Sequence, residues 1–141
     1  MNCQSVGVVM DPIESIKIHK DSTFAMMLEA QRRNLALWYL SPGDLMLIDG
    51  QCWAHQRAVN VTDDPVSWYL FTEERFSPLS ELDVILMRKD PPFDLNYISL
   101  TWMLELAANE GALVVNPPQA LRDFNEKLAI SLFPQYCVPS L

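Results

Sequence analysis

The sequence predicts an α/β domain with a mainly parallel central sheet and an inserted antiparallel hairpin. Short apolar runs alternate with segments of helical period along the chain, which is typical of parallel strands joined by helices. One Asp-Gly pair, Asp49-Gly50, lies between two extended segments and is among the strongest signals for a two-residue hairpin. The chain has 141 residues, half of them hydrophobic, which is enough for one domain with a sizeable core.

The first forty residues predict a β-α-β unit. The apolar run at residues 5–10 is too short for a helix and indicates a buried strand, and Asp-Pro begins a loop over residues 11–20. Asp21 or Ser22 can cap the helix that follows, and Asn34 can end it. Residues 35–40 then form the second strand.

The middle third of the sequence predicts an antiparallel segment that is inserted into this α/β unit. Residues 45–48 and 51–61 are the two arms of the Asp-Gly hairpin. Residues 68–71 form another short apolar run, and a polar stretch at residues 73–75 follows it.

The last third returns to alternating strands and helices. Residues 83–87 form a third core strand, and the two prolines in residues 88–94 exclude regular structure from the next loop. Asp94 can cap a helix that runs to residue 108, before Gly111. The remaining elements are a strand at residues 112–116 and a helix at about residues 119–132, which Pro134 ends.

Charge and composition exclude several classes of function. Ten basic and eighteen acidic side chains give a net charge of −8, which argues against binding to nucleic acid or to a membrane surface. The three cysteines and two histidines have no metal-ligand spacing, so we expect reduced thiols and no bound metal in this chain. We see neither a signal peptide nor an apolar run long enough for a membrane span, and we expect a cytoplasmic protein.

The few glycines argue against a dinucleotide-dependent oxidoreductase. Such an enzyme needs Gly-x-Gly-x-x-Gly between its first strand and first helix, where the backbone approaches a pyrophosphate. This chain has four glycines in all, and an Asp-Pro loop occupies that position.

Two polar clusters follow strands of the predicted parallel sheet, where ligands bind in folds of this class. The first contains Asp11, Lys20, Asp21 and Ser22 around a helix N-terminus, whose free N–H groups suit a carboxylate. An ordinary helix cap with solvated charges explains the same residues, and composition alone favours that explanation.

The second cluster begins with Arg88, the first residue after a strand. Its guanidinium can hold a carboxylate or phosphoryl group through two parallel hydrogen bonds, and we expect Asp90 and the two prolines to brace the Arg88 side chain. An Arg–Asp pair that only stabilises the loop is the alternative, and the residues alone leave both open. Lys127, on the predicted last helix, is by itself an ordinary exposed lysine.

Several blocks of sequence together resemble the amino-terminal part of bacterial glutathione synthetases. The blocks are residues 8–13, 20–26, 29–33, 86–94, 115–123 and 125–128, in the same order and with like spacing. The resemblance extends from about residue 5 to residue 134. It implies a Rossmann-like pre-ATP-grasp domain of three layers, with helices on both faces of the sheet, over residues 1–134. Residues 135–141 would begin the connection to an ATP-grasp domain.

The resemblance also implies an activity, an ATP-dependent carboxylate–amine ligation. The family joins γ-glutamylcysteine to glycine through an acyl phosphate, giving glutathione, ADP and phosphate. It implies that ATP and Mg²⁺ bind mainly to the ATP-grasp domain, so we expect no cofactor in this chain and no ligase turnover by this chain alone. The full-length protein would be a homo-oligomer, a dimer or a tetramer.

The resemblance assigns roles to individual residues as well. Those implied in substrate binding are Asp11, Lys20, Asp21, Ser22, Arg88 and Asp90. Lys127 would reach the ATP phosphates. A non-catalytic binding or oligomerisation module with the same fold is the alternative function.

Overall fold

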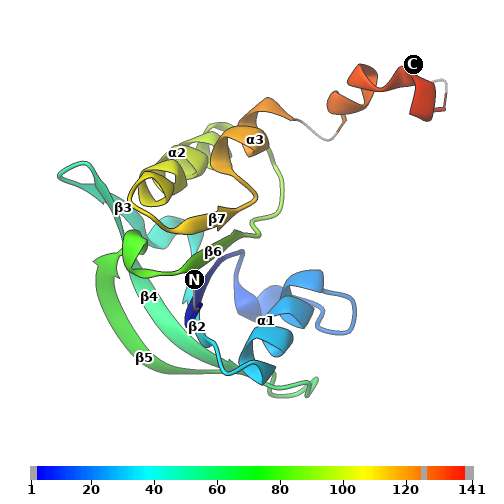
Figure 1. The fold of residues 1–141 in the computed structure, drawn as a ribbon. Coiled ribbons are helices and arrows are strands. Elements are labelled where there is room, and N and C mark those ends of the chain that lie inside the picture. The colour runs from blue at the N-terminus through cyan, green and yellow to red at the C-terminus, as the bar shows by residue number, and fades with distance from the viewer. Residues whose placement is uncertain (1–2, 125–126, 139–141) are drawn as a thin grey trace.

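The structure is a computed structural model, and it describes residues 3–124 and 127–138 (Figure 1). Its strands are β1 (Ser5–Val9), β2 (Ala36–Leu40), β3 (Leu45–Ile48), β4 (Gln51–Val61), β5 (Tyr69–Pro78), β6 (Val84–Met87) and β7 (Leu113–Val115). Its α-helices are α1 (Ser22–Arg32), α2 (Leu95–Asn109) and α3 (Pro118–Asp123). Short 3₁₀ turns are η1 (Ile13–Ser15), η2 (Pro42–Asp44), η3 (Leu79–Glu81), η4 (Ala129–Leu132) and η5 (Pro134–Tyr136).

The described strands form one seven-stranded sheet in the order β3-β4-β2-β1-β6-β7, with β5 paired to β4. Strand β1 pairs in parallel with both β2 and β6, and β6 pairs in parallel with β7. Strands β3, β4 and β5 form the antiparallel part, which joins the parallel part where β4 pairs with β2. The predicted mainly parallel sheet with an antiparallel insertion is therefore confirmed.

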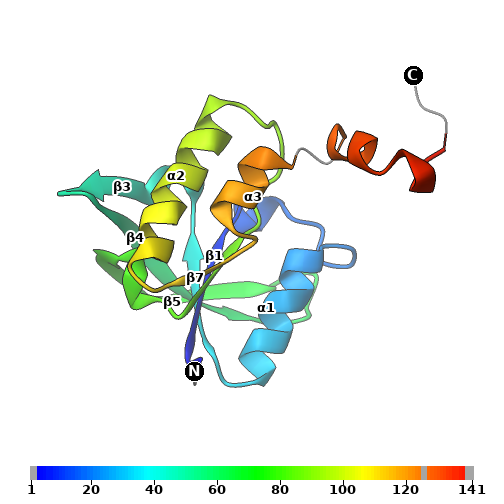
Figure 2. The same cartoon turned by 45° about the horizontal axis from the view of Figure 1, so that its top comes forward.

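Helices cover both faces of the sheet (Figures 1 and 2). On one face, Phe24 and Met27 of α1 belong to the same buried cluster as Val8 of β1. On the other face, the buried side chains of α2, among them Leu100 and Leu104, pack with residues of β2, β4 and β6. The alternation of side chains along each strand thus fills two cores, and the predicted three-layer arrangement is confirmed.

The predicted ends of the two long helices are confirmed by their capping geometry. Asp21 and Asp94 each accept a hydrogen bond, at 2.8 Å and 2.9 Å, from the backbone N–H three residues later. Asn34 and Gly111, just beyond the helix C-termini, have φ of 59° and 117°, in the left-handed region that ends a helix.

The Asp-Gly hairpin is confirmed, and the strand after it is longer than predicted. Asp49 and Gly50 both have positive φ, 49° and 82°, which a two-residue hairpin of this twist requires. Strand β5 continues through the polar stretch at residues 73–75, which the sequence analysis left outside the strand. Because β5 is an outer strand, Glu73 and Glu74 remain exposed to solvent there.

The predicted helix over residues 119–132 is wrong. Helix α3 ends at Asp123, and the short turns η4 and η5 follow it. Isolated helices are marginal in water, so packing of an apolar face must sustain them. The side chains of Leu128, Ile130 and Leu132 are instead exposed, and their segment extends away from the sheet in both views (Figures 1 and 2).

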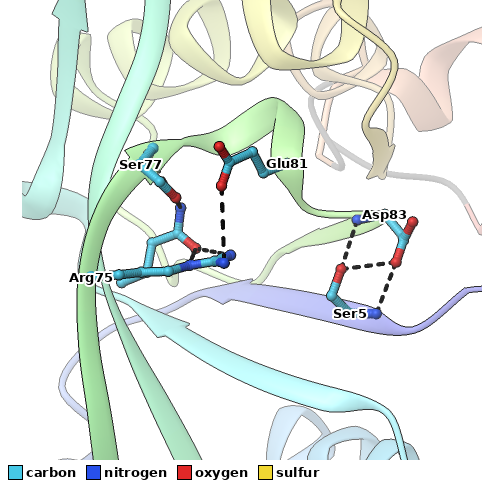
Figure 3. A network of polar contacts seen from close by, with 6 residues as sticks. Ser5, Arg75, Ser77, Glu81 and Asp83 are labelled. Atoms are coloured by element: carbon cyan, nitrogen blue, oxygen red, sulfur yellow. Dashed lines mark hydrogen bonds and ion pairs between the residues drawn. The ribbon is translucent and has the colours of Figure 1, made fainter.

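Asp83 joins the beginnings of β1 and β6, at the edge of the sheet opposite the strand ends that carry the predicted site (Figure 3). Its Oδ2 accepts hydrogen bonds from the backbone N–H groups of Gln4 and Ser5, both at 2.9 Å, and from the Ser5 hydroxyl at 2.8 Å. These bonds, the one from Gln4 most of all, hold the pKa of the Asp83 carboxyl below its usual 3.8.

We expect this lowered pKa to give the fold a specific acid sensitivity. The bonded carboxylate contributes stability above pH 3.8, and that contribution is lost as the pH falls through the lower pKa of the folded state. Asp83→Asn should therefore lower the urea midpoint at neutral pH and weaken its pH dependence below 3.8. Urea unfolding across this range checks the prediction, and curves that remain parallel for the two proteins would contradict it.

Candidate functional site

The candidate site lies where β1 and β6 end side by side. Asp11 follows β1 by two residues, and Arg88, Lys89 and Asp90 follow β6 directly. The backbone N–H of Arg88 donates to the carbonyl oxygen of Val9 at 2.8 Å, which carries the pairing of the two strands to the start of the loops. The parallel register thus brings together two loops that are 78 residues apart in sequence.

Asp11 holds these two loops together. Its Oδ2 accepts a hydrogen bond from the backbone N–H of Asp90 at 2.8 Å, and its Oδ1 lies 3.3 Å from Nζ of Lys89. The same Nζ donates to the backbone carbonyl of Asp90 at 2.9 Å. Both side chains of the ion pair are partly shielded, with 17% of Lys89 and 36% of Asp11 exposed, which strengthens their attraction relative to a surface pair.

The Arg88 side chain lies against the N-terminus of α1. Its Nε donates to Oγ1 of Thr23 at 3.0 Å and its Nη2 donates to Oγ of Ser22 at 2.9 Å. The expectation that Asp90 braces the Arg88 side chain is not met, because Asp90 uses its backbone to bond Asp11 and Lys89. Two hydroxyl groups, rather than a carboxylate, fix the guanidinium.

This arrangement concentrates positive potential. The N-terminus of the eleven-residue α1 carries a partial positive charge, and the guanidinium of Arg88 lies beside its first two residues. Asp21, the capping residue, offsets part of this charge. Placing a cation at this end of a helix is electrostatically unfavourable by itself, and a bound anion would relieve it.

A cleft of about 310 Å³ opens beside these loops, and we call it the loop cleft. It is lined by Asp11, Ser15, Ile16, Lys17, Lys20, Asp21 and Asp90. Two lysines and three aspartates thus face one small space. A second cleft of about 380 Å³ has Lys89 in its wall together with residues of η2 and α2.

The structure brings the six predicted substrate residues to one edge of the sheet. Four of them, Asp11, Lys20, Asp21 and Asp90, line the loop cleft. Ser22 and Arg88 are bonded to each other next to it, at the N-terminus of α1.

Lys127 is separate from this group in the chain, in the stretch between α3 and η4, and its side chain is exposed. Its predicted helical setting is wrong, since α3 ends at Asp123. Residues 125 and 126, which belong to the same sequence block, lie outside the described residues.

Two residues of the site were not assigned by the sequence analysis. Lys89 stands next to Arg88 in the same motif, and its adjacency to Asp11 in space is what gives it a role. Thr23 is 6% exposed and looks like an ordinary core residue of an amphipathic helix. No signal in the sequence indicates that its hydroxyl bonds a guanidinium 65 residues away.

The described residues contain neither a cluster suited to a metal ion nor a membrane-spanning helix. In residues 3–124 and 127–138, no three His, Cys, Asp or Glu side chains gather closely enough to hold a metal ion. Within the same ranges, no helix has the length and apolar character needed to cross a membrane.

Comparison with known proteins identifies the family. The family described as "Prokaryotic glutathione synthetase, N-terminal domain" matches residues 5–122. Glutathione synthetase of Vibrio parahaemolyticus is 55% identical over 130 residues, which are 92% of this chain and 41% of the relative. The Pseudomonas putida protein is 52% identical over 136 residues, 96% of this chain and 43% of the relative. The protein of Escherichia coli K12 is 55% identical over 128 residues, 91% of this chain and 40% of the relative.

The matched region includes the whole candidate site, from Asp11 to Asp90. The chain spans about two fifths of the length of the curated relatives that it matches. The family match covers residues 5–122, and the identities above 50% extend along nearly all of the chain. The chain belongs to the family of prokaryotic glutathione synthetase N-terminal domains.

Proposed function

We propose that this chain is the substrate-side domain of an ATP-dependent ligase that joins γ-glutamylcysteine to glycine. One observation carries the proposal beyond the family match. The guanidinium of Arg88 is fixed by Ser22 and Thr23 at the N-terminus of α1, so two sources of positive potential lie side by side. A carboxylate, or the acyl phosphate formed from it, is an anion that such a position stabilises.

The loop cleft fits the rest of the dipeptide. The γ-glutamyl group carries an ammonium and a carboxylate on one carbon, so its binding site needs both anions and cations. Asp11, Asp21 and Asp90 can face the ammonium, while Lys17 and Lys20 can face the carboxylate. We therefore place the γ-glutamyl end in the loop cleft and the reacting carboxylate near Arg88.

The remaining parts of the proposal concern partners outside the described site. ATP supplies the phosphoryl group that activates the dipeptide carboxylate, and we propose that ATP and Mg²⁺ bind mainly outside this chain, with Lys127 contributing to the ATP phosphates. We further propose that the first domain comprises residues 1–134 and that residues 135–141 begin the connection to the next. We place the ligase in the cytoplasm as a dimer or tetramer.

A domain exchange tests the proposed function. Residues 5–122 of this chain would replace the matching part of the Escherichia coli relative, and glutathione formation would be measured with γ-glutamylcysteine, glycine and ATP. We expect turnover within about tenfold of the parent, a rate ratio equivalent to about 1.4 kcal/mol, and no turnover from the 141-residue chain alone. A folded chimera that binds ATP but forms no glutathione would overturn the proposal and favour a non-catalytic binding module.

Lys127 gives a second, finer expectation in a chimera extended to include it. If its ammonium reaches the ATP phosphates, Lys127→Ala should raise the KM for ATP several-fold more than the KM for the dipeptide. Lys17→Ala is the matched control, because its exposed ammonium lines the loop cleft and should raise the KM for the dipeptide instead. Equal effects of Lys127→Ala on both substrates would contradict the assignment.

A further inference from the structure

One segment of the chain, residues 11–21, forms most of the wall of the loop cleft. It supplies six of the seven residues that line the cleft. One end of the segment is fixed by Asp11, which accepts a hydrogen bond from the backbone of Asp90, and the other end by Asp21, which caps α1. Residues 12–20 lie between these two fixed ends and include both lysines of the cleft. We call residues 12–20 the cleft loop.

The middle of the cleft loop is bonded to Trp68, which lies just before β5 and outside the candidate site. Nε1 of the Trp68 indole donates a hydrogen bond to the backbone carbonyl oxygen of Ile13 at 3.0 Å, across 55 residues of sequence. Ile13 is fully buried, and a buried carbonyl needs such a donor. Ile16 and Ile18 of the cleft loop pack against the same core cluster as Trp68. This side chain therefore attaches the cleft loop to the antiparallel part of the sheet.

Two hydrogen bonds inside the cleft loop are local. The backbone N–H of Ser15 donates to the carbonyl oxygen of Pro12 at 2.9 Å, and that of Lys20 donates to the carbonyl oxygen of Lys17 at 3.0 Å. Bonds of this kind shape the turns of the loop, but they do not fix its position on the sheet. The bond from Trp68 supplies that fixed position.

The support on which Trp68 stands is itself well bonded. Its backbone carbonyl accepts a hydrogen bond from the N–H of Thr62 at 2.9 Å, which closes the connection between β4 and β5. Gln31 of α1 bonds both backbone groups of Val61, donating to the carbonyl oxygen at 2.7 Å and accepting from the N–H at 2.8 Å. The ring of Tyr69 lies 5.8 Å from that of Trp68. The indole is thus held between α1 and the sheet before any ligand binds.

We propose that Trp68 is a positioning residue for the dipeptide, because it holds the loop that carries Lys17 and Lys20. The inference rests on the proposed function, which places the γ-glutamyl carboxylate against these two lysines. Trp68 is not among the residues that line the loop cleft, so it acts through the loop and not by contact with the substrate. The antiparallel insertion thereby contributes to substrate binding.

This role concerns binding more than chemistry. The two lysines face the γ-glutamyl end of the dipeptide, away from the reacting carboxylate near Arg88, so their attraction is the same in the ground state and the transition state. Loss of such uniform binding raises KM and leaves kcat unchanged. A purely structural role for Trp68 would instead lower the unfolding midpoint without moving either kinetic constant.

The first test uses amide hydrogen exchange in the 141-residue chain and needs no ligase activity. Trp68→Phe removes the indole N–H and keeps an aromatic ring, and we expect the amides of Ser15 and Lys20 to exchange about two- to tenfold faster, the factor that one hydrogen bond of ordinary net strength gives. The matched control is Trp53→Phe in β4, because the Trp53 indole N–H has no hydrogen-bond partner among the described residues. Exchange that is equal in the parent and in Trp68→Phe overturns the inference.

The second test measures kinetics in the chimera with the Escherichia coli relative, whose exchanged residues 5–122 include both tryptophans. Trp68→Phe should raise the KM for γ-glutamylcysteine about two- to tenfold, while kcat, the KM for ATP and the Trp53→Phe control remain close to the parent. In a chimera that already carries Lys17→Ala and Lys20→Ala, Trp68→Phe should add little, since the loop then presents no lysine to the substrate.

The outcomes separate this inference from the proposed function. An active chimera whose KM for the dipeptide is unchanged by Trp68→Phe, or equally raised by Trp53→Phe, overturns the role of Trp68 and leaves the proposed function intact. A folded parent chimera without turnover overturns the proposed function, and the substrate role of Trp68 with it. Circular dichroism checks the folding of each variant, and Trp68→Leu replaces Trp68→Phe if that variant does not fold.

Discussion

Phe24→Ala is expected to cost about 3–5 kcal/mol of unfolding free energy, the usual range for truncating a buried phenylalanine. The ring of Phe24 is 1% exposed and is among the largest fully buried side chains of the described chain. It lies in the first turn of α1 and belongs to the same core cluster as Val8 and Tyr39. Its loss removes much of the apolar contact that holds α1 on the sheet.

The same change should also disturb the candidate site, because Ser22 and Thr23 precede Phe24 in α1 and hold Arg88. Urea unfolding of the 141-residue chain measures the loss. Met26→Ala is the matched control, since Met26 lies in the same helix with 45% of its side chain exposed and should cost about 0.5 kcal/mol or less. Similar costs for the two variants would show that α1 is not anchored through this ring.

The opening β-α-β unit could be predicted because its signals are local. The side chain of Asp21 caps α1 by accepting a hydrogen bond from a backbone N–H in the first turn of the same helix. Asn34 ends that helix with φ of 59°. The Asp49-Gly50 hairpin depends only on two residues that tolerate positive φ. Each of these features is decided within a few residues, so tertiary structure has little opportunity to override it.

The errors arose where tertiary position decides the structure. Strand β5 keeps its polar residues 73–75 because it is an outer strand, and the sequence does not reveal which strand is outermost. The end of α3 at Asp123 depends on whether the apolar side chains that follow are buried against a partner, and Ile130 and Leu132 are exposed. Local helical periodicity is the same whether or not such a partner exists.

The candidate site likewise has features that could be predicted from the sequence and features that could not. Its place at the ends of β1 and β6 follows from the rule for parallel sheets, and all six predicted residues lie there. The pairing inside the site could not be predicted. Whether Arg88 bonds Asp90 or the hydroxyls of Ser22 and Thr23 depends on how α1 lies against the β6 loop, which no local pattern encodes.

In the chimeric ligase, Arg88→Lys is expected to lower kcat/KM for γ-glutamylcysteine by about 100- to 1,000-fold, or about 2.7–4 kcal/mol of transition-state stabilisation. Lysine keeps the positive charge, so the long-range attraction between this side chain and the anionic substrate would remain. It cannot reproduce the planar fork, in which Nε and Nη2 of Arg88 bond Thr23 and Ser22 and fix the orientation of the guanidinium. The lysine ammonium would then be a mobile and misplaced hydrogen-bond donor for the negative charge that develops on the substrate oxygens.

Stability separates this role from a structural one. Arg88 is partly exposed, so Arg88→Lys should leave the unfolding midpoint of the 141-residue chain almost unchanged. The matched control is Arg122→Lys, because the Arg122 fork bonds Thr101 at 3.2 Å and Glu105 at 2.7 Å, between α3 and α2. That change should lower stability and spare turnover. If Arg88→Lys behaves like Arg122→Lys, the Arg88 guanidinium joins α1 to the β6 loop and takes no part in catalysis.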